Sequence, residues 1–162
     1  MNLAQGAKLC TALEPTRGDA AVQGEGIDLT NAHMVFVVIQ HDQGAADRAT
    51  YTLQQDDGTD GNWEALTNTV PLWINNDTDA NDVLVRQTNA VLYQVSADVN
   101  PKMVVFQVDP SKLDDENGTS GDPNVALRVV KDATGDAGDT FNAIYIVAPT
   151  RYLGATVPEI RL

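Results

Sequence analysis

The chain has 162 residues, of which 43% are hydrophobic, so it can form one domain with a sizeable core and is too apolar for wholesale disorder. Its formal net charge of −13 argues against binding to a nucleic-acid backbone or to an anionic membrane surface. Cys10 is the only cysteine, which excludes an intramolecular disulfide and a multi-cysteine metal site.

The N-terminal region lacks the continuous apolar core of a signal peptide. No run of residues approaches the ~18 apolar positions that a transmembrane helix needs. We therefore expect synthesis and folding in a reducing cytoplasm.

Residues 1–26 differ in composition from the rest of the chain, because they mix Ala, Gly and Gln with isolated charges and contain Pro15. We interpret them as an extended N-terminal arm with one short strand near Ala7–Leu13. Such an arm either frays, as chain termini usually do, or orders against a neighbouring molecule. Residues 27–162 are then expected to form a single domain.

Short runs of β-branched and aromatic residues recur through this domain, and the loops between them are rich in Asp, Asn and Gly. Regularly spaced strands with such turns are typical of a β-sandwich or barrel. The sequence therefore predicts an all-β antiparallel sandwich of about eight or nine strands. The strand-like runs are residues 33–41, 48–55, 69–75, 82–87, 90–97, 102–109, 124–130 and 141–148.

Two of these runs are apolar on both faces, namely Ala32–His41 and Met103–Val108, whereas Arg48–Gln54 alternates between apolar and polar residues. An alternating strand has one face in solvent, so the two-sided pattern predicts central strands that are covered on both sides. The second covering layer is either another part of the chain or another subunit. Because a charge in a core strand is costly, we expect Phe36→Asp to unfold the domain.

Two prolines give local predictions. Pro71 cannot donate to a sheet ladder, so it predicts that residues 69–75 form an edge strand or a bulged one. Asp109 precedes Pro110, and this pair indicates the start of a short helical turn with Asp109 or Ser111 as its cap.

The Asp-rich loops raise the question of calcium, whose ligands are clustered oxygens. Asp56 to Gly61 resembles the start of an EF-hand loop, but Gly58 occupies the third ligand position and Thr67 stands where a bidentate Glu is needed. Further carboxylate clusters occur at residues 77–82 and 132–139. Asp is also a favoured turn residue, so we expect solvated turns and no cofactor, with a loop-borne Ca²⁺ ion as the alternative.

No catalytic constellation emerges from the sequence. Only His33 and His41 offer a base that titrates near neutral pH, and eight residues of extended strand would separate them by about 27 Å. No nucleophile elbow, zinc-protease motif or phosphate-binding loop occurs. We therefore expect a protein that is not an enzyme, with no catalytic and no metal-binding residues.

Carbohydrate binding is a separate alternative, because β-sandwiches can hold sugars on exposed aromatic rings. Trp63, Trp73 and Tyr152 are the candidate rings. Aromatic residues make up only 6% of the chain, so packing in the core is the main expectation for most of them.

The order of several segments resembles a family of small structural proteins of tailed bacteriophages, the capsid decoration or cement proteins. The resemblance spans roughly residues 27–160, and it rests on the succession of structural segments rather than on chemical motifs. These segments are residues 27–33, 48–55 with the turn through Gly61, 64–66, 103–108 before Leu113-Asp114, and 141–147 before 151–155.

The resemblance implies a jelly-roll-like sandwich that assembles as a dimer or trimer on the outer capsid surface of the virion and binds the major capsid protein. A tail or head-fibre component is the structural alternative, and it would predict an elongated trimer. If the arm makes the capsid contact, Leu3 and Leu13 could bury apolar surface there. Arg17 could pair with a carboxylate of the shell.

Overall fold

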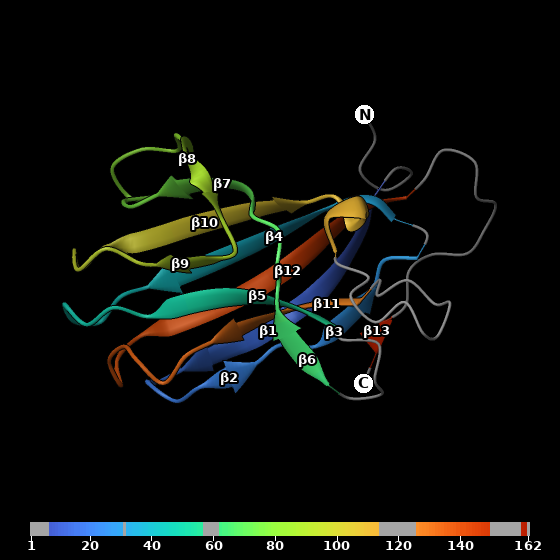
Figure 1. The fold of residues 1–162 in the computed structure, drawn as a ribbon. Coiled ribbons are helices and arrows are strands. Elements are labelled where there is room, and N and C mark those ends of the chain that lie inside the picture. The colour runs from blue at the N-terminus through green and yellow to red at the C-terminus, as the bar shows by residue number, and fades with distance from the viewer. Residues whose placement is uncertain (1–6, 31, 57–61, 114–125, 150–159, 162) are drawn as a thin grey trace.

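The computed structural model describes residues 7–30, 32–56, 62–113, 126–149 and 160–161, and these form two antiparallel sheets (Figure 1). The first sheet has six strands in the spatial order β1 (Lys8–Arg17), β12 (Thr140–Pro149), β4 (Ala32–Asp42), β10 (Pro101–Val108), β7 (Val70–Asn75) and β8 (Val85–Ala90). The second sheet has the order β13 (Ile160–Arg161), β3 (Gly26–Asp28), β11 (Ala126–Lys131), β5 (Thr50–Asp56) and β6 (Trp63–Ala65), with β2 (Val22–Gln23) also paired to β11 and β9 (Leu92–Gln94) to β5.

All strand pairs in the described part of the chain are antiparallel, which confirms the predicted all-β sandwich. The described residues contain thirteen strands, more than the eight or nine expected, because strands of two or three residues such as β2 and β13 leave no pattern in the sequence. No helix in this part of the chain is both long and apolar enough to cross a membrane.

The core lies between the two sheets and is built from alternate residues of their strands. Val35, Val37 and Ile39 of β4 are fully buried there, and so are Tyr51 and Leu53 of β5. Each of these residues points inward because side chains of a strand alternate between its two faces. The core is therefore a single layer of side chains shared by both sheets.

The strand predicted near Ala7–Leu13 is confirmed as part of β1, but residues 8–26 do not form a separate arm, because β1 is an edge strand of the six-stranded sheet. Its pairing with β12 runs from Lys8 opposite Val147 to Arg17 opposite Thr140. The Glu25 N–H joins the two sheets by donating to the Ala12 carbonyl of β1 at 2.9 Å, and the preceding Gly24 N–H donates to the Val129 carbonyl of β11 at 2.8 Å. A Cβ atom at Gly24 would lie 2.6 Å from that carbonyl oxygen, so this close approach requires glycine.

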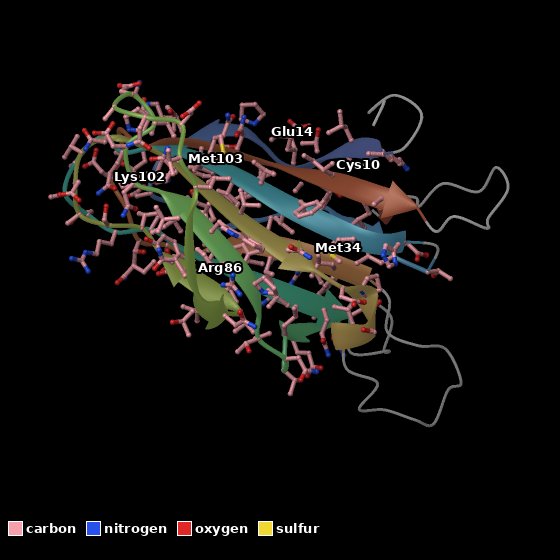
Figure 2. All side chains as sticks on the ribbon, turned by 90° about the horizontal axis from the view of Figure 1, so that it is seen from above. Cys10, Glu14, Met34, Arg86, Lys102 and Met103 are labelled. Carbon is pink, nitrogen blue, oxygen red and sulfur yellow. The ribbon has the colours of Figure 1, made fainter. Side chains whose placement is uncertain are left out.

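Strands β4 and β10 are central in the sheet, as predicted, but they are covered on one side only within the described structure. Met34, Phe36 and Val38 of β4 lie on the side away from the core and are half-buried. Figure 2 looks onto this side, with β1, β12, β4, β10, β7 and β8 lying next to one another. The second covering layer that the sequence predicted is not supplied by a described strand of the same chain.

The two proline predictions also have clear outcomes. Strand β7 lies between β10 and β8, so it is not an edge strand, and its register against β8 shifts between Val70 and Leu72, where Pro71 lies. The bulged alternative is therefore confirmed. A 3₁₀ turn follows at Pro110–Lys112, and Asp109 caps it by accepting the Ser111 N–H at 2.9 Å.

Candidate interaction surface

The outward side of the six-stranded sheet carries a continuous apolar surface, which we call the outer face. It consists of half-buried or exposed side chains from the three central strands together with Val105, which is 8% exposed. Its residues are Met34, Phe36 and Val38 of β4, Ile144 and Ile146 of β12, and Met103 and Val105 of β10.

Strand register places these side chains in rows across the sheet. Val38 lies opposite Ile144 on one side and Val105 on the other, and Val105 in turn lies opposite Trp73 of β7. Directly opposed residues have Cβ atoms about 5 Å apart, so each row is a line of touching side chains. The outer face is therefore as regularly packed as a core layer, but no described strand of the chain lies above it.

The charge distribution makes this surface unusual for such an acidic chain. Strands β7, β10 and β12 contain no Asp or Glu, although the chain has 23 acidic residues. Ile144 is 38% exposed, and Leu9 of β1, which lies opposite Ile146, is 55% exposed. A contiguous exposed apolar patch of this kind marks an interaction site on a soluble protein.

A hollow of about 600 Å³ adjoins the outer face at the end of the sheet where β4 meets β10. Gln40, Met103 and Asn142 form its floor from adjacent strands, because Gln40 lies opposite both other residues. Arg17 and Asp42 also line it, and both are exposed. The outer face thus passes from an apolar centre to a polar hollow that has a charge of each sign.

The three predicted contact residues, Leu3, Leu13 and Arg17, have different outcomes. Leu13 is only 2% exposed and belongs to the core, so it is not available for a surface contact. The β-bulges on either side of Leu13 allow it to point inward next to Ala12, which is also buried. Arg17 is exposed at the hollow, and Leu3 lies outside the described residues.

A buried polar cluster lies beneath the hollow and joins the loops at this end of the sandwich. His41 Nδ1 is 2.8 Å from the Tyr51 hydroxyl, and His41 Nε2 is 3.6 Å from Asp139 Oδ2. Burial lowers the pKa of His41, and this effect outweighs the opposing influence of Asp139. The imidazole is therefore neutral at pH 7, and its contact with Asp139 is not an ion pair at that pH.

Tyr51 and the two buried lysines complete this cluster. Burial, with Asp139 nearby, raises the pKa of Tyr51 far above its ordinary value, so its hydroxyl keeps its proton. Lys131 is fully buried and donates to the Thr134 carbonyl at 2.7 Å, and Lys102 is 2% exposed and donates to the Asn100 carbonyl at 2.9 Å. Buried polar groups satisfied in this way fix the positions of the loops that surround the hollow.

The carboxylates of the 132–139 cluster, which the sequence offers as calcium ligands, accept hydrogen bonds from backbone N–H groups of the loops. Asp139 accepts the N–H groups of Gly44 and Asp136, and Asp136 accepts the N–H of Gly138. Burial alone would raise the pKa of Asp132, but hydrogen bonds from Thr134 and Thr50 bring it below its ordinary value. Among the described residues, no three acidic, histidine or cysteine side chains converge as a metal site would require. The loop at residues 57–61 lies outside them.

The two candidate sugar-binding tryptophans are each covered by an arginine. The Arg86 guanidinium lies 4.9 Å from the ring centroid of Trp73, and the Arg128 guanidinium lies 4.6 Å from that of Trp63. Such a cation–π contact occupies one face of each ring, so that face is not free to stack on a sugar. Tyr152 lies outside the described residues.

The two histidines have different surroundings. His33 is exposed, whereas His41 is 1% exposed within the polar cluster. Both belong to β4, eight residues apart on one strand, as the sequence predicts.

Comparisons with known proteins give little guidance. No protein-family model matches the chain, and no curated protein matches it. Among solved structures, SPBc2 prophage-derived protein YomS is 13% identical, with a TM-score of 0.47 over 88% of this chain and 93% of that one. A structure of infectious bursal disease virus, Gt strain, is 12% identical, with a TM-score of 0.24 over 95% of this chain and 43% of that one. Both TM-scores are below 0.5, so we base no argument on either likeness.

The central outer-face residues follow from a pattern already visible in the sequence. The two-sided apolarity of residues 34–39 and 103–108 indicated a second contact surface, whereas Ile144 and Ile146 were not singled out. Residues 141–148 have the same two-sided pattern, with Ile144 and Ile146 alternating with Ala143, Tyr145 and Val147. Applying the same test to this run would have identified them.

Proposed function

We propose that the protein is a virion structural protein of a tailed bacteriophage that decorates the outer capsid surface. In this role it binds the major capsid protein through the outer face and holds neighbouring capsid subunits together. The protein works by binding alone and is not an enzyme. It is made in the host cytoplasm and functions on the virion.

The single observation that carries this proposal is the apolar centre of the outer face, whose strands β7, β10 and β12 contain no carboxylate in a chain of net charge −13. Acidic loops keep the unassembled protein soluble, whereas the uncharged face can approach another protein without desolvating charge. A specific contact usually buries about 1,600 Å² in total, and many copies around one shell add avidity. The sequence resemblance over residues 27–160 points in the same direction.

The hollow provides a polar contact beside this apolar one. Arg17 is exposed at the edge of the hollow and can form a bidentate ion pair with a carboxylate of a capsid subunit. The loops around it are braced by the buried cluster of His41, Lys102 and Lys131. A rigid rim of this kind loses little conformational entropy on binding.

Co-sedimentation with expanded, undecorated capsids tests the proposal. Val38→Asp places a charge at the centre of the outer face, and Val130→Asp places the same charge on the outward side of β11 in the other sheet. Both valines are half-buried, so the pair is matched in residue type, substitution and exposure. We expect the wild type and Val130→Asp to sediment with capsids and Val38→Asp to remain in the supernatant.

Thermal melting of each variant separates binding from folding. A folded Val38→Asp protein that sediments as the wild type does would exclude the outer face as the capsid contact. A wild-type protein that leaves every expanded capsid undecorated would exclude the decoration role itself. Arg17→Ala is expected to weaken capsid binding by about tenfold and to leave the melting temperature unchanged.

A further inference from the structure

The edge strand β8 begins in a segment that is exposed throughout. Strand β8 is last in the six-stranded sheet and pairs with β7 on one side. Residues 82–86, Asp-Val-Leu-Val-Arg, are five consecutive exposed residues. Val83 is 59% exposed, Leu84 40% and Val85 54%, although water-exposed positions on strands are usually polar. This segment therefore presents apolar side chains beside a strand edge that no other described strand pairs with.

The segment is complementary to itself when it is read in the opposite direction. An antiparallel pair of two such segments, centred on Leu84, places Asp82 opposite Arg86 of the second copy, and Arg86 opposite its Asp82. Val83 and Val85 then lie opposite each other in both halves, and Leu84 lies opposite Leu84. Apolar and opposite-charge pairs at directly opposed positions stabilise a sheet, whereas like charges destabilise it.

Side-chain hydrogen bonds fix the backbone at the start of this segment. The Asn75 side chain is buried and donates from Nδ2 to the Asn81 carbonyl at 2.8 Å. The Asn81 side chain in turn accepts the N–H of Val83 at 2.9 Å. These bonds fix the residues before β8 against the end of β7, so little ordering would be required when a partner strand arrives.

The opposite edge of the same sheet is protected in the usual ways. Strand β1 contains Pro15, two β-bulges and the exposed Glu14. Prolines, bulges and charges at an edge prevent pairing with another strand. Strand β8 has no proline and no acidic residue, which leaves it as the edge suited to a partner.

We propose that two copies of this chain associate through antiparallel pairing of residues 82–86 about a two-fold axis at Leu84. The pairing joins the two six-stranded sheets edge to edge and gives two reciprocal contacts between Asp82 and Arg86. It is a self-association that does not depend on the capsid role, and it uses the strand edge rather than the outer face. The contact is small, so it is strengthened when many copies are held close together.

The test is charge exchange in the full-length protein, followed by sedimentation equilibrium over a range of concentrations. Asp82→Arg places arginine opposite arginine at both contacts, and Arg86→Asp places aspartate opposite aspartate. Each variant alone is expected to weaken self-association by about tenfold or more. An equimolar mixture of the two is expected to recover it. The first variant carries arginine at both positions and the second carries aspartate at both, so their heterodimer has two opposite-charge pairs.

Two further variants make the test specific to the register. Asp79→Arg has the same change of charge on an exposed residue three positions earlier, and it is expected to leave self-association unchanged. Leu84→Asp places two carboxylates together at the axis and is expected to abolish it. Melting curves check that Arg86→Asp still folds, because Arg86 also donates to the Leu72 carbonyl and lies over Trp73.

The outcomes are distinct. A wild-type protein that stays monomeric at every concentration would overturn the inference, as would equal effects of Asp79→Arg and Asp82→Arg. Failure of the mixture to form a heterodimer from two folded variants would exclude the proposed register. Loss of self-association with capsid binding intact would support this pairing and leave the proposed function standing.

Discussion

The two faces of β4 consist of the same kinds of residue but have different surroundings. Val35, Val37 and Ile39 are fully buried against the second sheet, whereas Phe36 and Val38 on the opposite face are half-buried. Composition therefore does not distinguish a face inside the fold from a face prepared for another molecule. What distinguishes them is whether a strand of the same chain lies above, and that depends on the whole topology.

The inner face is expected to show the largest effect of a charge. Val37→Asp would bury a carboxylate in the core between Phe106 and Tyr145, which lie opposite it on the neighbouring strands. Burial there removes the carboxylate from water, so we expect a loss of at least about 4 kcal/mol and an unfolded protein. Circular dichroism would measure this, and a cooperative melt close to that of the wild type would show that the inner face is wrongly assigned.

The neighbouring position on the outer face is expected to tolerate the same charge. Phe36→Asp leaves its carboxylate in contact with water, so we expect a folded protein that is about 1–2 kcal/mol less stable, mainly from lost apolar contact with Ile146. The sequence alone predicted unfolding here, because it treated both faces of β4 as core. Chemical denaturation of the two variants side by side would measure the difference, and equal unfolding would mean that the outer face is covered.

The smallest expected effect concerns pH and the buried cluster. Burial lowers the pKa of His41, so the unfolded chain binds a proton more readily than the folded one once the pH falls below about 6.5. Stability should therefore decrease as the pH is lowered from about 7.5 to about 5.5. His41→Gln should reduce this slope. Identical slopes in the variant and the wild type would show that His41 does not contribute.

Much of the fold could be predicted because strand patterns are local. The eight apolar runs, the bulge at Pro71 and the turn capped by Asp109 all depend on residues close together in the sequence. The sequence predicts an arm over most of β1 because its isolated charges and Pro15 hide the alternation, and because its partner β12 lies more than a hundred residues further on. Pairing over such a distance leaves no local signal.

The candidate surface was partly predictable for the same reason. Two-sided apolar strands indicated that a second layer was needed, but they could not tell whether the chain itself supplies it. Leu13 illustrates the limit, since the sequence predicts a contact residue there and the side chain instead lies in the core. The bulges that turn Leu13 inward depend on its pairing with β12, which only the structure reveals.

Cryo-electron microscopy of capsids incubated with the purified protein tests the central claim most directly. We predict ordered density on the capsid exterior, with the side chains of Phe36, Val38 and Ile144 lying against major capsid subunits. Density in which this sheet faces the solvent while another surface contacts the shell would contradict the assignment of the outer face. A bare shell at saturating protein concentration would contradict the decoration role.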